Sequence, residues 1–198
     1  MSENALYDSQ GNRLYLTSEE RAAFLEASRT AERRLKCFCH VLHHAGCRLS
    51  EALELTPARV DLNGQCLRVR TLKKRDGKIV FREIPVPPAL IENLDMVFGI
   101  REMQKRGQRK ELDVLLWSWS RVHAWRLVKG IMDKAAIAEG VHKSPKGLRH
   151  GFGVNAIRVG IQLNMLQKWM GHSDMKTTAI YANALGEEER EIAARMWE

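Results

Sequence analysis

Four side chains that could act together on a phosphodiester stand at fixed distances along the chain. Tyr181 lies nine residues after His172, which follows Gly171, and Arg149 lies 23 residues before His172. Arg48 lies a further 101 residues upstream. Arginine presents a planar fork of donors that matches two phosphate oxygens, and tyrosine can carry a phosphoryl group covalently. The set therefore predicts cleavage of a phosphodiester by a tyrosine, without a metal.

The strings around these residues resemble a known family. AGCRLSEALELT and SPKGLRHGF, followed by Gly171-His172 and Tyr181, are similar to the catalytic domain of tyrosine recombinases, the phage integrase, Xer and Cre group. The resemblance runs from about Thr17 to Tyr181, and with 47 residues before Arg48 the chain is most similar to small single-domain members. It implies a mainly α fold with a small antiparallel β-sheet (α+β), the DNA breaking-rejoining enzyme fold.

The same resemblance implies a function and partners. The expected enzyme is a site-specific recombinase that cleaves and rejoins double-stranded DNA through a 3′-phosphotyrosyl intermediate, without metal, cofactor or ATP. It would form a homotetramer on paired DNA sites and a monomer or dimer away from DNA, with an accessory DNA-bending protein as a candidate further partner. Integration, excision, inversion and resolution all stay open as outcomes.

The resemblance gives each catalytic residue a role. Tyr181 attacks the phosphorus, Arg48 and Arg149 hold its non-bridging oxygens, and His172 adds a donor where negative charge grows. The family's second box usually reads His-x-x-Arg, whereas this chain has Lys146 three residues before Arg149. Lysine keeps a proton-carrying donor there, as in the related type IB topoisomerases. The change argues against a role for neutral imidazole, because lysine loses its proton only when desolvated or near other cations.

A basic β-hairpin is expected in the string CLRVRTLKKRDGKIVFREIPVP. Apolar and basic residues alternate from Leu67 to Thr71, an Asp76-Gly77 turn follows, and strand character returns from Ile79 to Ile84. In the family this hairpin carries a lysine that protonates the leaving 5′ oxygen. Lys73 matches that lysine best and Lys74 is the second choice. The alternative is a solvated hairpin without a catalytic role. The expected DNA contacts lie on this hairpin and a later helix: Arg68, Arg70, Lys74, Arg75, Arg121, Arg126 and Lys129.

Composition agrees with a nucleic-acid partner but is less specific. The net charge is +8 and the sequence pI is about 9.5, which favours a polyanionic ligand. Two other classes stay open: a type IB topoisomerase that relaxes supercoils as a monomer, and a DNA-binding regulator without catalysis. The intact set of catalytic residue types argues against the regulator.

Cysteine usage and the N-terminal residues favour a cytoplasmic location, and the family resemblance implies a bacterial protein that is associated with the nucleoid when bound to DNA. The four cysteines show no extracellular disulfide framework, and neither a signal peptide nor a membrane-spanning run is visible. On a helix, His40, His43, His44 and Cys47 could share a face and ligate zinc. Neither common Cys–His zinc spacing is present, so we expect a buried helix and no metal.

The elements that must position the site are mostly helices. We expect a loose leader at 1–16, the catalytic domain at 17–185 and a tail helix at 186–198 that docks on another protomer. A mobile basic loop is expected at 101–111, and Gly151 and Gly153 weaken a helix start. Helices are predicted from Thr17 and at 31–44, 49–56, 89–98, 122–139, 148–159, 163–170 and 175–184.

Overall fold

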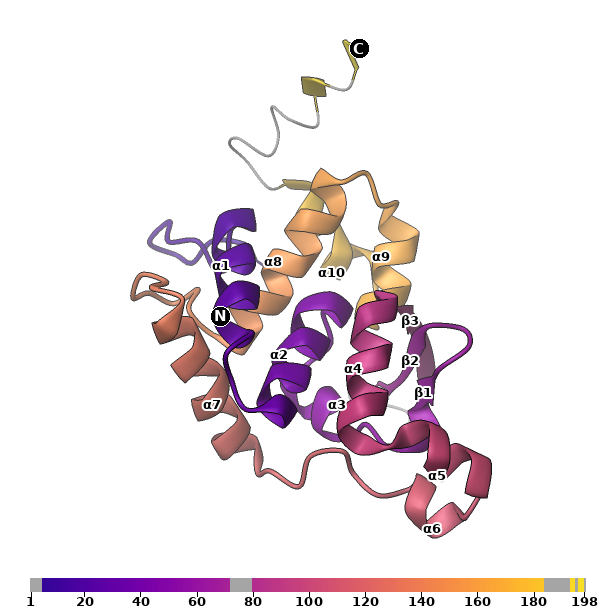
Figure 1. The fold of residues 1–198 in the computed structure, drawn as a ribbon. Helices are drawn as coiled ribbons and strands as arrows, with labels where there is room; N and C mark the ends of the chain where they lie inside the picture. The colour runs from indigo at the N-terminus through magenta and orange to yellow at the C-terminus, as the bar shows by residue number, and fades with distance from the viewer. Residues whose placement is uncertain (1–4, 72–79, 184–192, 195, 198) are drawn as a thin grey trace.

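The computed structural model describes residues 5–71, 80–183, 193–194 and 196–197. Helices make up most of it, and three short strands form one antiparallel sheet (Figure 1). In chain order the elements are α1 (Ser18–Ser28), α2 (Arg33–Ala45), α3 (Leu49–Leu53), the 3-10 helix η1 (Pro57–Arg59), β1 (Val60–Asp61), β2 (Cys66–Arg70), β3 (Phe81–Pro85), α4 (Pro88–Phe98), α5 (Ile100–Arg106), α6 (Arg109–Leu112), α7 (Arg121–Lys134), α8 (Pro145–Arg158), α9 (Leu163–Met170), α10 (Met175–Ala179) and the 3-10 helix η2 (Ile180–Asn183). The predicted fold class is confirmed.

Side-chain caps set the starts of two helices that matter for the site. At α1 a capping box joins Thr17 and Glu20, so each satisfies a backbone N–H of the other. At α8 the hydroxyl of Ser144 accepts from the N–H of Gly147 at 3.1 Å. Pro145 occupies the first turn of α8, where a helix needs no N–H donor. Ser144 and Pro145 therefore define where α8 begins.

Left-handed glycines end two other helices just before predicted site residues. Gly46 ends α2 at φ 55° and Gly171 ends α9 at φ 67°. L side chains rarely adopt this backbone conformation, whereas glycine does so freely. The turns place Arg48 and His172 immediately beyond the ends of their helices.

The sheet has the order β1-β2-β3, and all neighbours are antiparallel. The register pairs Arg68 with Glu83 and Val69 with Arg82. Along β3 the exposed Phe81 and Glu83 alternate with the buried Arg82 and Ile84. One face of the sheet therefore carries a buried arginine. The turn expected at Asp76-Gly77, together with Lys73, Lys74 and Arg75, lies outside the described residues.

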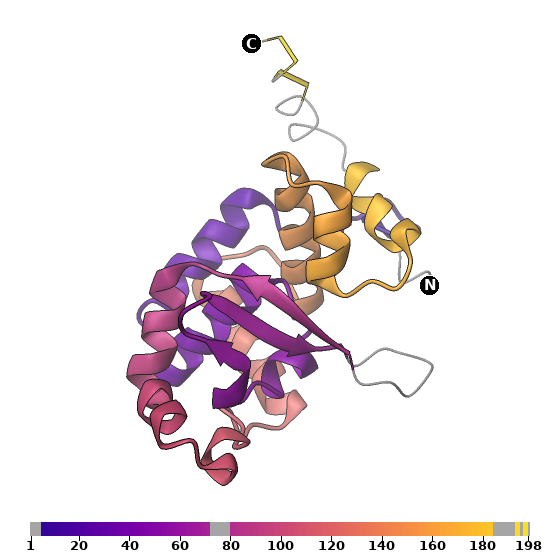
Figure 2. The ribbon, with the colours of Figure 1, turned by 90° about the vertical axis from the view of Figure 1, so that its right-hand side faces the viewer.

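Helix α2 runs through the middle of the molecule. In Figure 1, α1 and α7 lie on its left, and α4 and the sheet on its right. The larger hydrophobic core fills these layers and includes the fully buried Phe24, Phe38 and Leu67, with Trp117 almost fully buried. In Figure 2, helices α8, α9 and α10 stack above the sheet, so the C-terminal helices and the hairpin meet along one edge.

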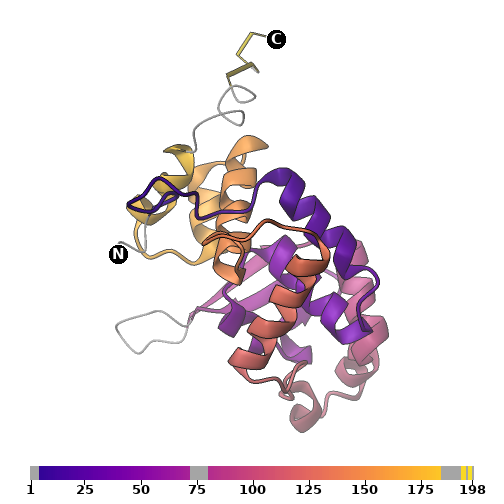
Figure 3. The same cartoon turned by 90° about the vertical axis from the view of Figure 1, so that its left-hand side faces the viewer.

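A second, smaller core lies under the C-terminal helices. It joins Leu6 and Tyr15 to Leu166, Met170 and Tyr181. Figure 3 shows the N-terminal segment alongside these helices. The expectation of a loose leader is thus wrong for residues 5–16, because several of their apolar side chains are buried against the rest of the protein.

Three expectations about elements need correction. Residues 101–111, which were expected to form a mobile loop, lie mostly in α5 and α6. Ile100, the first residue of α5, is fully buried and packs that helix against the core. Helix α7 ends at Lys134 rather than at 139, because Ala136 adopts a left-handed φ of 52°. Helix α10 ends at Ala179 and passes into η2. Most of the predicted tail helix lies outside the described residues, and no helix in the described part is long and apolar enough to cross a bilayer.

Candidate active site

Arg149 is the buried centre of the candidate site. It lies in the second turn of α8 and is 8% exposed. One terminal nitrogen, Nη1, donates to the carbonyl of Gly46 at 2.8 Å, and the other, Nη2, donates to the carbonyl of Met170 at 2.7 Å. The guanidinium thereby ties together the ends of α2 and α9. Burial, with the charge of Arg48 nearby, lowers the pKa of Arg149 to about 10, so it stays charged at neutral pH.

A buried carboxylate links Arg149 to two further arginines. Glu51 is fully buried, and its Oε1 accepts from Nη1 of Arg48 at 2.9 Å. Its Oε2 lies 2.6 Å from Nη2 of Arg82 and 3.9 Å from Nη1 of Arg149. Burial opposes ionisation of Glu51, but the charge and hydrogen bonds of Arg82, with Arg149 and Arg48, outweigh it and lower its pKa. Three guanidinium groups share one carboxylate, so the group keeps positive charge.

From the sequence alone, neither Glu51 nor Arg82 was given a role in the site. A sequence pattern nevertheless marks each of them. Glu51 lies three residues after Arg48, which is the spacing of a capping box, and its carboxylate accepts from the N–H of Arg48 at 2.8 Å. Arg82 lies two residues before Ile84 along the strand, a spacing that puts both on one face. Nε of Arg82 also donates to the carbonyl of Trp169 at 2.7 Å.

His172 lies directly against Arg149. Nη2 of Arg149 is 3.1 Å from Nε2 of His172, and Nδ1 of His172 is 2.9 Å from the hydroxyl of Thr178. Because arginine can only donate, Nε2 accepts and Nδ1–H donates to Thr178. Burial and then the charge of Arg149 lower the pKa of His172 to about 3, so its ring is neutral at physiological pH. The predicted role as a donor to phosphate therefore requires a proton on Nε2, which here accepts from Arg149.

Tyr181 lies in η2, beside the histidine. Its ring is nearly parallel to that of His172, with centroids 6.3 Å apart and an interplanar angle of 13°. Its hydroxyl forms a hydrogen bond of 3.1 Å with Nδ1 of His150. The side chain is only 1% exposed. Burial raises the pKa of Tyr181 to about 12, although Arg149 and Arg48 act in the opposite direction.

The structure thus brings four of the six predicted catalytic residues into one group. Arg149, His172 and Tyr181 are in direct or stacked contact, and Arg48 joins them through Glu51. Lys146 is exposed in the first turn of α8, one turn before Arg149. Its charge helps to lower the pKa of His150 to about 4, after the larger effect of burial. Lys73, the sixth residue, lies outside the described part.

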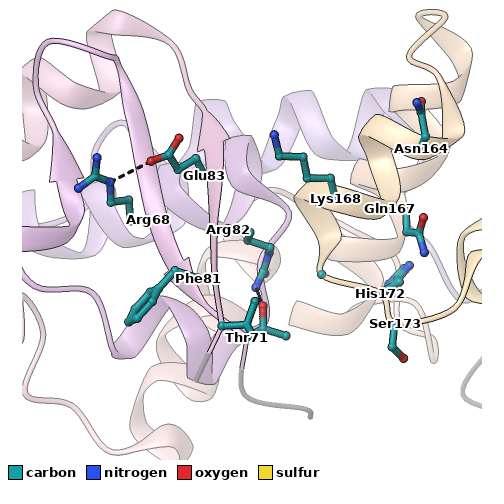
Figure 4. A pocket seen from close by; sticks show the side chains of 12 residues that line it. Arg68, Thr71, Phe81, Arg82, Glu83, Asn164, Gln167, Lys168, His172 and Ser173 are labelled. Atoms are coloured by element: carbon teal, nitrogen blue, oxygen red, sulfur yellow. Dashed lines mark hydrogen bonds and ion pairs between the residues drawn. The ribbon is translucent and has the colours of Figure 1, made fainter. Parts of the chain in front are cut away.

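A cleft of about 650 Å³ opens between the sheet and α9, next to His172 (Figure 4). On the sheet side Arg82 and Thr71 line it, and Nη1 of Arg82 donates to the hydroxyl of Thr71 at 3.0 Å. On the α9 side Gln167 and Lys168 line it, both with long polar side chains. No sequence motif marks these α9 residues, because they lie on an ordinary amphipathic helix.

The described basic residues predicted to contact DNA are spread over two faces. Arg68 pairs with Glu83 at 3.0 Å on the sheet, and Arg70 lies 3.5 Å from Glu54. A further group lies along α7. There Arg121 and Arg126 are exposed, and Lys129 lies over the ring of Trp125 and near Glu139. The cleft side and α7 are therefore separate candidate contact regions.

The histidine and cysteine cluster of α2 is largely buried. Burial lowers the pKa of His40 to about 4 and that of His43 to about 2, with neighbouring cations adding to the effect. Burial raises the pKa of Cys47 to about 12. Within the described ranges, no group of three or more His, Cys, Asp or Glu side chains is arranged to hold a metal ion.

The chain matches known proteins along most of its length. The model of the phage integrase family matches residues 14–188. Tyrosine recombinase XerA of Thermococcus onnurineus is 28% identical over 182 residues, which cover 88% of this chain and 60% of that protein. Tyrosine recombinase XerD of Neisseria meningitidis serogroup B is 31% identical over 156 residues, which cover 76% and 50%. The chain thus spans between half and three-fifths of these relatives.

Solved structures show the same fold. XerA recombinase superposes with a TM-score of 0.74 at 22% identity, covering 93% of this chain and 65% of that one. XerH recombinase bound to difH substrate superposes with a TM-score of 0.70 at 22% identity, covering 97% of this chain and 60% of that one. The catalytic domain of bacteriophage HP1 integrase superposes with a TM-score of 0.65 at 19% identity, covering 91% of this chain and 93% of that one. The matches confirm the resemblance found in the sequence.

Proposed function

Because the chain belongs to the phage integrase family, we propose that it is a site-specific DNA recombinase. Tyr181 attacks a scissile phosphorus, keeps the 3′ phosphate as a phosphotyrosyl ester and releases a 5′ hydroxyl. The 5′ hydroxyl of a second strand then reverses the reaction. The convergence of Arg149, His172 and Tyr181 from three separate segments of the chain carries this proposal. One ester replaces another, so the bond's free energy is retained and ATP is not needed.

The arginine group would bind and polarise the phosphate. Arg149 is fixed by two carbonyls, and Arg48 keeps 32% of its side chain exposed beside the site. Glu51 balances only one of the three guanidinium charges around it, which leaves positive charge for an entering phosphate. Preorganised donors of this kind stabilise the charge that grows on the non-bridging oxygens in the transition state.

Two lysines would complete the proton transfers. We assign the general acid for the leaving 5′ oxygen to Lys73, with Lys74 as the alternative, on the connection between β2 and β3. Its flanking strands border the cleft beside His172, which supports this assignment. Lys146, exposed at the start of α8, would add a charged donor near the phosphate.

Double-stranded DNA is the proposed partner. The solved XerH and Tn1549 integrase structures are described as bound to a difH substrate and to transposon right end DNA, respectively. We propose contacts through Arg68, Arg70, Lys74, Arg75, Arg121, Arg126 and Lys129. The proposal includes a homotetramer on paired sites, an accessory bending protein and a bacterial cytoplasm as the place of action.

The proposed domain limits are 17–185 for catalysis and 186–198 for a docking tail. In the tail, Met196 and Trp197 are 84% and 79% exposed, and such large apolar side chains suit burial against another protomer.

The experiment is to trap the covalent intermediate. Nicked duplexes prepared from the DNA that flanks the gene are incubated with protein in excess chelator, and protein–DNA adducts that survive detergent are counted. The wild type should form adducts, Tyr181→Phe should bind DNA but form none, and Tyr7→Phe should match the wild type as a control for loss of a phenol. Adducts persisting in Tyr181→Phe would refute the assignment.

Lys146 gives a second candidate function, because type IB topoisomerases carry lysine in this place. Supercoiled plasmid without paired recombination sites distinguishes the two. A topoisomerase would relax it at low protein concentration, whereas a recombinase that requires paired sites would not.

A further inference from the structure

The nucleophile of the proposed function is covered in this structure. Tyr181 is 1% exposed, and its hydroxyl is bonded to His150 inside the protein. An attacking oxygen must come within about 3–3.5 Å of the phosphorus with an open path to it. The oxygen of Tyr181 has no such path to a DNA strand outside. The position seen here is therefore a resting position.

A glycine on α8 makes the space for the tyrosine ring. A Cβ atom built on Gly153 would lie 2.5 Å from Cε1 of Tyr181 and 2.6 Å from its Cδ1 and Cζ. Real Cβ atoms do not come this close, so the ring occupies the place of a missing side chain. Gly153 and His150 lie three residues apart on one face of α8. Gly153, His150 and His172 enclose the ring; we call this space the tyrosine seat.

The other glycines of α8 serve different neighbours. A Cβ on Gly151 would lie 2.4 Å from the carbonyl oxygen of Leu16, and one on Gly147 would lie 1.8 Å from that of His142. Those contacts are with backbone and fix the N-terminal segment and the preceding loop. Gly153 has the ring of Tyr181 as its nearest neighbour, whereas Gly147 and Gly151 do not. Glycine weakens a helix interior, so its presence here is explained by this contact.

We propose that Gly153 is a positioning residue that holds Tyr181 in the tyrosine seat until DNA binding draws the ring out for attack. The release of Tyr181 by DNA rests on the proposed function, whereas the packing of its ring in the tyrosine seat is a property of the free protein. A methyl group at 153 removes the space for the ring and shifts the population of Tyr181 towards exposed positions. Gly153→Ala should therefore expose the nucleophile without touching any charged residue.

The first test measures exposure of the tyrosine in the free protein. Tetranitromethane nitrates exposed tyrosines, and trypsin releases Tyr181 in the peptide from 177 to 190, which contains no other tyrosine. Nitration of Tyr181 should be at least about tenfold faster in Gly153→Ala than in the wild type, because the exposed conformation of the ring changes from a minor to a major population. Gly130→Ala is the matched control, because a Cβ there meets nothing within 4 Å. Equal nitration rates in Gly153→Ala and wild type would overturn the proposal.

The second test separates the seat from a general weakness of α8. Gly153→Ala should lower the urea midpoint of the wild type but raise that of Tyr181→Ala, because alanine is the better helix former once the ring is gone. Gly151→Ala should lower the midpoint equally in both backgrounds, since it meets Leu16. A loss in Gly153→Ala that is the same in both backgrounds would refute the seat.

The third test concerns the reaction. If the seat is a resting position, Gly153→Ala should form adducts on nicked duplex several-fold faster than the wild type. Slower adduct formation together with fast nitration would contradict the resting role and make the seat part of the reactive arrangement. The first two tests use no DNA, so they decide on the seat even if Tyr181→Phe still forms adducts and the proposed function fails.

Discussion

Neutralising the buried carboxylate of Glu51 should cost far more stability than neutralising an exposed one. Glu51→Gln keeps the shape of the side chain but leaves Arg82 and Arg149 buried without their counter-charge. Removing one partner of a buried ion pair costs about 3–5 kcal/mol. Coulomb's law with an effective dielectric constant of about 20 gives about 4 kcal/mol for one pair at 4 Å, which agrees. We expect the free energy of unfolding to fall by about 3–5 kcal/mol.

Glu83→Gln is the matched control. Glu83 pairs with Arg68 at 3.0 Å, but both side chains are more than half exposed. An exposed pair contributes about 0–1 kcal/mol, so this variant should unfold almost like the wild type. Urea unfolding followed by tryptophan fluorescence gives both free energies. A loss in Glu51→Gln no larger than that in Glu83→Gln would refute the view that Glu51 holds the arginine group together.

Acid should reveal the same carboxylate. The folded pKa of Glu51 is depressed, so its contribution is present above the unfolded pKa of about 4.3 and is lost as pH falls through the folded value. Below about pH 4.3 the wild type should therefore lose stability more steeply than Glu51→Gln.

Four further outcomes are expected. Lys146→His should keep partial adduct formation near or below pH 6.5, where imidazole is still protonated, and Lys146→Ala should lose more; equal activity of Lys146→Ala and wild type would exclude the proposed role. Burial lowers the pKa of His43 to about 2 and of His150 to about 4, so the unfolded chain takes up protons first as pH drops from about 6.5. The free energy of unfolding should then decrease by up to about 1.4 kcal/mol per pH unit for each histidine, and urea midpoints should fall with it. A midpoint that is flat from pH 7 to 5 would contradict this. Leu6→Ala should cost about 2–4 kcal/mol if the N-terminal segment packs as described, and no loss would show that it does not. Truncation after Gly186 should weaken cooperative binding to paired sites and spare single-site cleavage, and normal recombination by the truncated protein would rule out docking of the tail.

The spacing of the sequence strings singled out Arg149, His172 and Tyr181, and the structure brings these three side chains together. Arg149 lies in the second turn of α8 and His172 follows the glycine that ends α9, and glycines and caps mark such helix ends in a single sequence. Their spacing follows the lengths of α8, α9 and α10, which local patterns set. The helical character of most segments was predictable for the same reason.

Long-range contacts were not predictable from these local patterns. Glu51 and Arg82 lie 31 residues apart, and their pairing depends on how β3 approaches α3. A charged residue on a strand is normally exposed, so the hairpin's basic character concealed a buried arginine. Gly153 looked like a defect in a helix, because the ring that occupies its space comes from another element.

The contacts of Arg82 also bear on the proposed role of a hairpin lysine. Its Nε donates to the carbonyl of Trp169, and a Cβ on Gly171 would lie 2.9 Å from its guanidinium, so β3 is fastened to the end of α9 where the histidine follows. Strand β3 is the strand that leads out of the connection containing Lys73. Moving that strand would therefore move the phosphate-binding group and the proposed general acid together. Arg82→Lys keeps the charge but loses the fork that reaches Glu51 and Trp169 at once. If this fastening matters, Arg82→Lys should slow adduct formation at least about tenfold while Arg68→Lys on the exposed face does not, and equal rates in the two variants would show that the hairpin is positioned by other contacts.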